Sequence, residues 1–514
     1  MNLKTKILEL ETGGKPIVVL NKDDADDLGI KGLGRVKIES NKKEMTTIVN
    51  ITTKLVSSGF AGVSEKIKNV LDLKENSEIS IEVAKFPTSL QHIKSKLNGR
   101  KLNSKEIHEI VKDVVEGNLS EIEIASFVTA LDTRGFDLDE AAAMSIAMVE
   151  NGKQLKLNKK IVVDKHSCGG VPGDKTTLLI VPIVAAAGLT IPKTSSRAIT
   201  SAAGTADRVE VIMPVDLDID EMKSVVEKTN GCFVWGGALD LAPADDIFIQ
   251  VEYPLSIDPL MLPSIMSKKK AVGANLVVID IPTGRGTKVK TIGDATLLAK
   301  DFIELGKKID IKVNCAITDG EQVIGHTIGP ALEAREALEV LMRRKNQMDL
   351  IDKATHLAGM IFEMAGKENG QRLALDILKS GKAEEKFREI AMMQGGDYEI
   401  KPEEIEIGKY GFDVTAERNG FVLWIDNKSI VELAIAAGSP KDKGAGIVLH
   451  KKFGEKVEKD ESLMTIYTEK PRKLERVRKM LDETKVIGIG ERREMLIQKV
   501  RDETDHKKTF ILER

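Results

Sequence analysis

Apolar strands that each run into a glycine- or hydroxyl-rich loop constrain this chain more than any other feature. Residues 159–167, KKIVVDKHS, form one such segment, and 189–195, 231–237 and 274–284 repeat it with helical sequence in between. Alternation of this kind predicts a mostly parallel sheet covered by helices. Loops that follow parallel strands gather along one edge of the sheet, where ligands of open α/β sheets bind. We therefore expect a ligand site built from these loops.

Residues 1–86 form a separate module that contains a duplication. Each copy has a short helix, a turn and an alternating strand, with apolar positions at a constant offset. The matched positions are Leu28, Ile30, Val36 and Ile38 in the first copy and Leu71, Leu73, Ile79 and Ile81 in the second. The pattern resembles the two halves of a double-psi barrel. No catalytic pattern stands out here, so we expect this module to serve assembly or to act as a lid.

Changes of periodicity divide the rest of the chain. Helical periodicity runs through residues 87–155 and returns between two of the strands, so we expect both stretches to pack together. After Pro402 short strands alternate with Gly and Asp turns, a pattern that resembles a biotinyl-type hammerhead without its modifiable lysine. We therefore predict a multidomain α/β protein. Its expected parts are an N-terminal double-psi-barrel-like β module (1–86), a helical domain (87–155 and 242–272), a mostly parallel-sheet α/β phosphate- and nucleotide-binding domain (156–241 and 273–401), a C-terminal α+β hammerhead-like domain (402–495) and a charged tail (496–514).

Charge and cysteine content exclude several classes of protein. The formal net charge is −3, without the basic surface that a nucleic-acid-binding protein uses to release counterions. Cys168, Cys232 and Cys315 are too widely spaced for a disulfide framework or a zinc pattern. The N-terminus carries charges in every turn, unlike a signal peptide, and the longest uncharged run, 176–192, is too short to cross a bilayer. We expect a cytoplasmic protein with no cofactor, no metal, and no nucleic-acid or membrane partner.

The first loop, DKHSCGGVPGDKTT at 164–177, has the composition of an anion site. A strand delivers it and a helix leaves it, so backbone amides can point at an anion with a helix N-terminus behind them. Glycines permit close approach, Lys165 supplies charge and Ser167 a hydroxyl donor. Asp174 separates the glycine and the lysine that a P-loop requires side by side, which argues against a nucleotide hydrolase. His166 could act as a base or simply hydrogen-bond within the loop.

The second loop, at 192–208, interleaves hydroxyl and cationic side chains with small residues. Their density suits several phosphate oxygens at once, whereas a helix N-cap needs only one such group. The third loop, IPTGRGTK at 281–288, ends in Lys288, which could reach the same pocket or stay solvated.

A fourth element begins at Asp258. Ser264 and Lys268 are four residues apart and share a helix face. Asp258 itself, beside a proline, could be no more than a helix N-cap.

At these loops the chain resembles the thymidine/pyrimidine nucleoside phosphorylase family. The family's D-K-H-S-x-G-G-V-G-D loop is matched by Asp164 to Asp174 with Pro172 inserted, its S-x-R…G-G-T-x-D-K segment by Ser195 to Arg208, and its S-I-x-x-K-K helix by Ser264 to Lys269. The resemblance covers residues 87–490 and includes QGGD at 394–397. It implies a small-molecule enzyme, a pentosyltransferase, that pairs as a homodimer or larger homo-oligomer.

Three departures set the chain apart from ordinary members of that family. The base-gripping Tyr-x-x-Arg is replaced by Phe248 to Val251, which removes an arginine for a pyrimidine carbonyl. Ser196, Thr200 and Ser201 stand where glycines and a histidine would lie, and the N-terminal module is additional. These features resemble the archaeal AMP phosphorylase branch, which uses inorganic phosphate as co-substrate to split AMP, and possibly CMP and UMP, into base and ribose 1,5-bisphosphate in nucleotide salvage. The extra hydroxyls fit a second phosphate group, which needs donors of its own.

The resemblance also implies roles for individual residues. Asp258 would be the general acid that protonates the leaving base, which requires a carboxyl pKa raised by burial or by nearby anions. The attacking phosphate would be held by Lys165, Ser167, Thr177 and Ser195. The nucleotide would be held by Gly170, Ser196, Arg197, Ala198, Ile199, Thr200, Ser201, Thr205, Ser264 and Lys288, of which Thr205 could also serve the attacking phosphate. The helical segments would swing against the α/β domain to close the cleft.

Three other functions stay open at this point. A nucleoside phosphorylase that prefers uridine or thymidine would share the fold and differ at Phe248, Val251 and the second loop. A P-loop-like hydrolase would need magnesium and be inhibited by a chelator. A non-catalytic nucleotide-binding scaffold would bind AMP and release no adenine.

Overall fold

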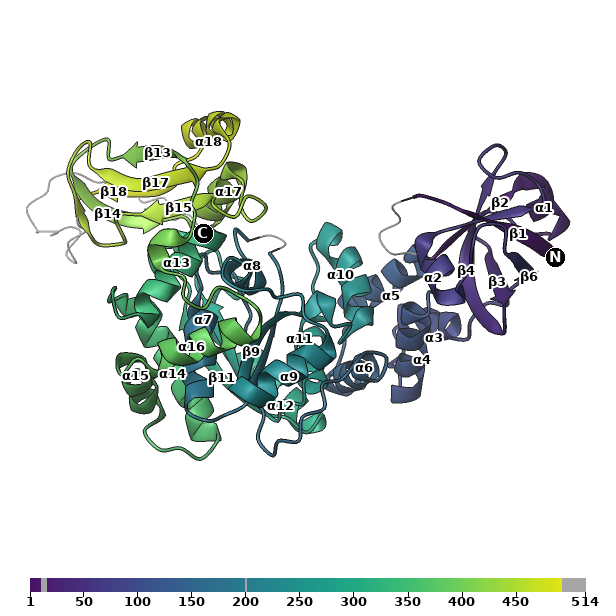
Figure 1. The fold of residues 1–514 in the computed structure, drawn as a ribbon, viewed down its shortest axis with the longest axis horizontal. Helices are drawn as coiled ribbons and strands as arrows, with labels where there is room; N and C mark the ends of the chain where they lie inside the picture. The colour runs from purple at the N-terminus through teal and green to yellow at the C-terminus, as the bar shows by residue number, and fades with distance from the viewer. Residues whose placement is uncertain (11–15, 199–200, 492–514) are drawn as a thin grey trace, which may run out of the picture.

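The computed structural model describes residues 1–10, 16–198 and 201–491 and shows an elongated molecule (Figure 1). A β barrel and a C-terminal β region lie at opposite ends, with a helical region and an α/β region between them (Figure 1). The chain is thus a multidomain α/β protein. The charged tail expected at 496–514 lies outside the described residues.

A parallel sheet forms the centre of the α/β region. Its strands are β7 (Val163–Ser167), β8 (Ile191–Ser195), β9 (Gly231–Trp235), β10 (Leu276–Thr283) and β11 (Lys312–Asp319). β10 lies between β11 and β7, parallel to both, and β8 pairs in parallel with β9. A parallel bridge from Val162 to Thr190 joins the two groups. The parallel sheet predicted from the strand–loop–helix alternation is confirmed.

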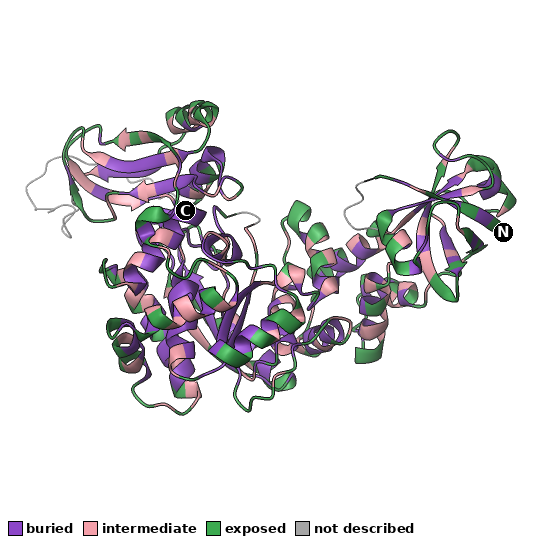
Figure 2. Cartoon of the chain, in the orientation of Figure 1, coloured by how far each residue is buried: buried purple, intermediate pink, exposed green. Residues whose placement is uncertain are grey.

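Helices cover both faces of this sheet. Alternate side chains of its strands therefore pack into two different hydrophobic cores. Val278 of β10 belongs to one core, and its neighbours Val277 and Ile279 belong to the other. Figure 2 shows these strands as largely buried, and the helices beside them as a mixture of buried and exposed residues. The helices are α7 (Thr176–Ala186), α8 (Thr205–Val209), α9 (Ile219–Thr229), α12 (Ile292–Lys308), α13 (Pro330–Leu341), α14 (Met348–Met364), α15 (Gly370–Lys379) and α16 (Lys382–Met393), with a 3-10 helix at Gly236–Ala238.

The helical region combines two stretches that are distant in sequence. Its helices are α3 (Ser89–Leu97), α4 (Ser104–Val115), α5 (Glu121–Arg134), α6 (Leu138–Glu150), α10 (Pro243–Leu255) and α11 (Met261–Ala271). α10 packs against α4 and α5, and α11 packs against α6. The rings of Phe127 and Phe248 lie 6.1 Å apart in the shared core. α11 also borders the α/β region, so this region is placed to carry side chains to the loops of the sheet.

The N-terminal region is a closed barrel in the strand order β1-β5-β2-β4-β3-β6. Its elements are β1 (Asn2–Ile7), β2 (Ile17–Asn21), α1 (Lys22–Asp27), β3 (Arg35–Ser40), β4 (Lys43–Thr52), β5 (Phe60–Val63), α2 (Glu65–Leu71) and β6 (Glu78–Val83). Ile38 and Ile81, which occupy matching positions of the sequence repeat, face each other across an antiparallel pair. The Arg35 guanidinium donates to the Asn118 carbonyl at 2.8 Å and pairs with Glu123, which fixes the barrel to the helical region.

The C-terminal region is attached to the α/β region through a shared sheet. β12 (Thr327–Ile328) pairs with β15 (Gly446–Leu449), and the Ala331 amide donates to the Lys443 carbonyl at 3.0 Å. The other elements are β13 (Tyr410–Thr415), β14 (Gly420–Ile425), α17 (Asn427–Ala437), β16 (Lys456–Val457), β17 (Ser462–Thr468), α18 (Pro471–Glu483) and β18 (Ile487–Gly490), after a 3-10 helix at Pro402–Glu404. The strands form the sheets β12-β15-β17-β13 and β16-β14-β18.

The described residues contain neither a membrane-spanning helix nor a cluster of metal-ligating side chains. None of the helices in 1–10, 16–198 and 201–491 combines the length and the apolar character needed to cross a membrane. Within the same ranges, no group of three or more His, Cys, Asp or Glu side chains could hold a metal ion.

Candidate active site

The first and third loops meet at the carboxyl edge of the sheet. Gly170 has φ +96°, and a Cβ added to it would lie 3.0 Å from both the Lys288 amide nitrogen and the Thr287 Cα. The Lys288 Nζ lies 2.8 Å from the Asp258 Oδ2. The structure therefore brings together Gly170, Lys288 and Asp258, which come from both sides of the boundary between the α/β and helical regions.

The predicted donors of the first loop surround a buried carboxylate, Asp280. The Ser167 hydroxyl donates to the Asp280 Oδ2 at 2.8 Å, and the Lys165 Nζ lies 3.9 Å from the same oxygen. The Lys165 side chain is 2% exposed and the Asp280 side chain 0%. Thr177 is buried in the first turn of α7. Lys165, Ser167 and Thr177 thus all lie at the junction of β7, β10 and α7.

Lys353 of α14 also belongs to this cluster, although no sequence motif indicated it. Its Nζ lies 3.0 Å from the Asp280 Oδ2 and 3.1 Å from the Asp174 Oδ2. Burial opposes its charge, but Asp174 and Asp280 together hold the pKa of Lys353 above its usual value. Burial likewise opposes ionisation of Asp174, yet Lys353 and Lys165 hold the pKa of that carboxyl well below its usual range. The one sequence signal was Asp280 itself, a charge inside an otherwise apolar strand.

The start of α7 differs from a P-loop in its contacts. The Asp174 Oδ1 accepts hydrogen bonds from the Thr176 amide at 3.2 Å and the Thr176 hydroxyl at 2.5 Å, so it occupies the place of a phosphate. Lys175 is 0% exposed, and its ammonium donates to the carbonyls of Ile324 and Thr327 and to Glu336. Neither residue is free to bind a nucleoside triphosphate.

Asp207 of α8 shapes the second loop. Its Oδ2 accepts from the Ala198 amide at 2.7 Å and from the Gly204 amide at 2.9 Å, which closes the loop on itself. A Cβ on Gly204 would lie 2.5 Å from the Ser196 carbonyl oxygen, so only glycine fits there. Ile199 and Thr200 lie outside the described residues.

The side chains of the second loop differ in what they offer a ligand. Arg197 stacks over the Trp235 ring at 4.8 Å and pairs with Glu210 at 2.6 Å and Asp216 at 3.2 Å, so its guanidinium is already engaged by the protein. Ser196 and Ser201 are exposed, while Ser195 and Thr205 are half-buried. The Ser195 hydroxyl lies 3.5 Å from the Val234 carbonyl oxygen, and the Ser201 hydroxyl 3.3 Å from the Ala203 carbonyl oxygen. The loop presents hydroxyls and amides on a framework fixed by Arg197 and Asp207.

The C-terminal region reaches this second loop. The Lys443 Nζ lies 2.6 Å from the Glu210 Oε2 and 3.4 Å from the Asp207 Oδ1. Ala202 packs in the hydrophobic core of the C-terminal region. The second loop is therefore held from two domains, which sequence reasoning missed because Lys443 lies in no motif.

Asp258 lies in the connection between α10 and α11 and is more exposed than expected for a general acid. Its side chain is 43% exposed and faces Lys288. Ser264 is half-buried on α11, and Lys268 pairs with Asp245 at 2.6 Å.

Phe248 and Glu252 of α10 are both buried, and Glu252 contacts the connection that carries Asp258. Phe248 is 0% exposed within the helical core, so it does not line a base-binding surface. The Glu252 carboxylate accepts from the Leu260 amide at 3.1 Å, and burial, followed by the charges of Asp258 and Asp245, raises its pKa to about 7.

A second buried lysine cluster lies beneath the first and second loops. Asp164 pairs with Lys269 at 2.6 Å and with Lys193 at 3.4 Å. Burial lowers the pKa of Lys193 to about 7. Burial and the charges of Lys269 and Lys193 hold the pKa of His166 well below its usual value, so its imidazole is neutral at pH 7.

The three cysteines are free. Burial raises the pKa of Cys168 in the first loop to about 12, so its thiol is not a nucleophile at neutral pH.

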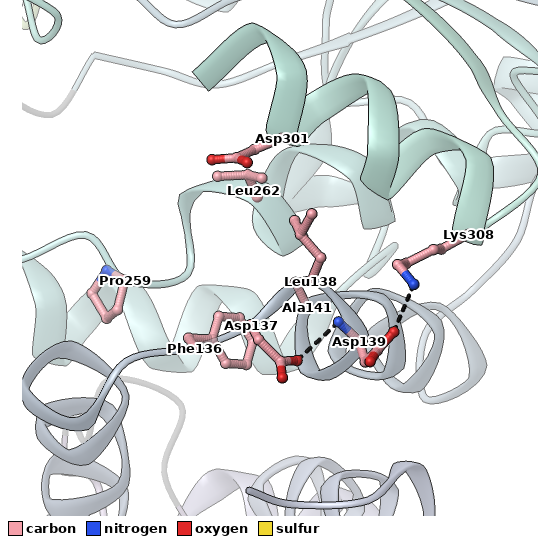
Figure 3. Close-up of a pocket in the computed structure, with 9 residues that line it drawn as sticks. All are labelled: Phe136, Asp137, Leu138, Asp139, Ala141, Pro259, Leu262, Asp301 and Lys308. Atoms are coloured by element: carbon pink, nitrogen blue, oxygen red, sulfur yellow. Dashed lines mark hydrogen bonds and ion pairs between the residues drawn. The ribbon is translucent and has the colours of Figure 1, made fainter. Parts of the chain in front are cut away.

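A surface pocket lies between α6, α11 and α12, and Pro259 is one of its lining residues (Figure 3). Two of its lining residues, Lys308 and Asp139, form an ion pair at 2.6 Å that links the α/β region to the helical region. The pocket is lined by Phe136, Asp137, Pro259, Leu262, Asp301 and Lys308, among others. Among the residues that the structure describes, no predicted phosphate- or nucleotide-binding residue lines this pocket, so the candidate site is the loop cluster.

Comparisons with known proteins place the chain in a family. Residues 159–384 match the "Glycosyl transferase family, a/b domain", 90–152 the "Glycosyl transferase family, helical bundle domain", and 421–488 the "Pyrimidine nucleoside phosphorylase C-terminal domain". A protein from Thermofilum pendens named AMP phosphorylase is 49% identical over 502 residues, covering 97% of this chain and 98% of that protein. One of the same name from Thermococcus kodakarensis is 51% identical over 494 residues, covering 95% and 98%. The chain belongs to the AMP phosphorylase family.

The family assignment confirms the resemblance seen in the sequence, including the branch. A further AMP phosphorylase, from Methanocaldococcus jannaschii, is 47% identical over 507 residues, covering 97% of this chain and 99% of that protein. The crystal structure of anthranilate phosphoribosyltransferase from Thermus thermophilus superposes with a TM-score of 0.50 at 21% identity, covering 59% of this chain and 99% of that chain. That likeness concerns the fold alone. AMP phosphorylase relatives match nearly the whole length of this chain, so the barrel and the C-terminal region are part of the family's architecture.

Proposed function

We propose that this chain is an AMP phosphorylase, which uses inorganic phosphate to cleave the N-glycosidic bond of AMP and yields adenine and ribose 1,5-bisphosphate. The observation that carries this proposal is the pairing of two separate donor-rich loops at one sheet edge, in a chain about half identical to proteins named AMP phosphorylase. The first loop serves the attacking phosphate through Lys165, Ser167 and Thr177, together with Ser195 near the start of the second loop. The rest of the second loop serves the nucleotide's own phosphate group.

The proposed chemistry is a displacement at C1′ of the ribose. A phosphate oxygen bonds to C1′ as the C1′–N bond breaks, and the electron pair remains on the base, which Asp258 protonates. Gly170, Ser264, Lys288 and residues 196–201 with Thr205 hold the nucleotide. Positioning both reactants in a closed cleft supplies much of the rate enhancement.

The Lys288 ammonium lies 2.8 Å from the Asp258 carboxylate. A nucleotide phosphate that attracts Lys288 separates this cation from the acid when substrate binds.

We also propose a function for each domain. Residues 87–155 with 242–272 form the moving helical domain, 156–241 with 273–401 the phosphate- and nucleotide-binding domain, and 402–495 a hammerhead-like domain that supports the second loop. The barrel of residues 1–86, of the double-psi type, serves assembly into a homodimer or larger homo-oligomer. The enzyme works in the cytoplasm on small molecules, without a cofactor.

Two of the other functions fit the contacts less well. A P-loop hydrolase is disfavoured because Asp174 fills the phosphate position at α7 and Lys175 is buried against Glu336. A pyrimidine nucleoside phosphorylase lacks a use for the hydroxyl-rich second loop, and Phe248 lies in the helical core.

Base release measured by chromatography tests the proposal. AMP or adenosine is supplied with and without inorganic phosphate, with EDTA present throughout. We expect adenine from AMP only, and only with phosphate. Release from adenosine at an equal rate would favour a nucleoside phosphorylase, and no release from AMP would overturn the proposal.

A further inference from the structure

Two carboxylates lie where an anion is expected to bind, one from the first loop and one from β10. The Asp280 Oδ2 accepts a hydrogen bond from the Ser167 hydroxyl, and Asp174 lies just before α7. The Asp280 side chain is 0% exposed and that of Asp174 is 12% exposed. Unbalanced negative charge in such a place would repel inorganic phosphate, because water screens little of it.

We infer that Lys353 is a positioning residue for the attacking phosphate, acting by neutralising Asp174 and Asp280. This inference rests on the proposed function. The Lys353 ammonium bridges the two carboxylates at 3.1 and 3.0 Å from a side chain that is 9% exposed. Lys353 belongs to α14, which packs against α7 and β10. The position of its side chain is therefore determined by helix packing in the core and not by the conformation of the first loop.

The balance of charges explains why a second lysine is needed. Lys165 and Lys353 together offset Asp174 and Asp280, which leaves the glycine amides and the positive end of α7 to attract phosphate. Without Lys353 the cluster carries a net negative charge beside a dianionic substrate. The Lys165 ammonium, now at 3.9 Å from Asp280, would be drawn to the unpaired carboxylates and away from phosphate.

The first experiment is the variant Lys353→Met, which preserves much of the side chain's length and removes its charge. We expect the KM for phosphate to rise by at least ~10-fold while the KM for AMP changes by less than about 3-fold, because the second loop has its own ion pairs. Equilibrium binding of inorganic phosphate, measured by calorimetry, should weaken in parallel. An unchanged phosphate affinity in a folded variant would overturn the inference.

A second variant separates charge balance from simple structural damage. In Lys353→Met/Asp280→Asn the lost positive charge is matched by a lost negative charge, while the amide oxygen can still accept from the Thr318 hydroxyl, which now bonds the Asp280 Oδ1 at 2.6 Å. We expect the phosphate KM to return to within about 3-fold of the parent value. A double variant as impaired as Lys353→Met would show that Lys353 does not act through the carboxylates.

A matched control exists in the helical region. Lys96 forms an equally buried ion pair with Glu140 at 2.7 Å, remote from the loops. Lys96→Met should lower the Tm and leave the phosphate KM at the parent value. If both lysine variants raised the phosphate KM alike, the effect would be general destabilisation and the inference would fail. If the parent chain itself released no adenine from AMP with phosphate, the proposed function would fail first, whereas an active parent with an unaffected Lys353→Met refutes the positioning role alone.

Discussion

The first and second loops leave neighbouring strands of one sheet, yet they are held by different kinds of contact. The first loop is surrounded by ion pairs from the core, in which Lys165 and Lys353 are 2% and 9% exposed. The second loop is tied by Arg197 and Lys443, which are 29% and 37% exposed. Buried pairs interact strongly and fix geometry, whereas exposed pairs contribute little and exchange partners easily.

This difference suits the two ligands that the loops are proposed to bind. Inorganic phosphate is small and rigid, so a preorganised site with balanced charge favours it at little entropic cost. A nucleotide must be enclosed as the domains close, so a loop held from both the α/β and the C-terminal regions can adjust. The comparison predicts that variants of the two loops will affect different Michaelis constants.

The largest effect is expected at Asp258, which belongs to neither loop. Its substitution should therefore lower kcat without separating the two Michaelis constants. Asp258→Asn should lower kcat for AMP phosphorolysis by at least ~100-fold, because the leaving base loses its proton donor. Steady-state kinetics should show both KM values within a few-fold of the parent. Asp301→Asn, in the neighbouring pocket, is the control and should retain kcat. An active Asp258→Asn would remove this residue from the mechanism.

The next largest effect should appear at Asp207, whose carboxylate closes the second loop through the Ala198 and Gly204 amides. Asp207→Ala leaves both donors without their acceptor, and charge-assisted hydrogen bonds of this kind contribute about 1.5–3 kcal/mol. We expect the KM for AMP to rise by roughly 10- to 50-fold with little change in the KM for phosphate. An equal rise in both constants would break the distinction between the loops.

A smaller effect is expected at Lys443, whose exposed ion pairs reach the second loop from the C-terminal region. Lys443→Met should raise the KM for AMP by about 2- to 5-fold, since exposed pairs contribute at most about 1 kcal/mol. High salt should weaken AMP binding in the parent and have less effect in the variant, because screening removes the same interaction. A salt response identical in the two proteins would contradict the proposed support from the C-terminal region.

The last prediction concerns stability, not a Michaelis constant, and tests how pH affects the connection that carries Asp258. The pKa of Glu252 is raised to about 7 in the folded chain, so the folded state binds more protons than the unfolded state between pH values of about 4.5 and 7. This contribution to stability is present below that window and is lost as the pH rises through it, by about 1–2 kcal/mol. Glu252→Gln keeps an acceptor for the Leu260 amide and should flatten the decline in the free energy of unfolding. Urea unfolding at pH 5 and pH 7.5 measures the difference, and parallel slopes in parent and variant would contradict it.

Much of the architecture followed from the sequence because local patterns encode it. Alternating strand and helix periodicity predicted the parallel sheet, and the first loop was predicted to run from a strand into a helix. The structure adds that Gly169, Gly170 and Gly173 have positive φ values there. The family motifs gave the candidate residues, and the relatives confirm the family. The roles of the individual residues stay predictions.

Other features depended on contacts between distant segments. Asp258 was expected beside anions or in a buried position, but it is 43% exposed and faces Lys288 of the α/β region. Lys443 meets Asp207 across 236 residues of sequence. No local pattern records which lysine of a charged helix or loop will find such a partner.

The sequence by itself determined the strands, the loops and the family, because each depends on residues close together in the chain. Tertiary structure alone decided how the charges of the site are balanced. Lys353 lies 179 residues from Asp174 and reaches it only because α14 packs against α7 and β10. The energy of an ion pair depends on separation and burial in space, and neither quantity is written in the local sequence.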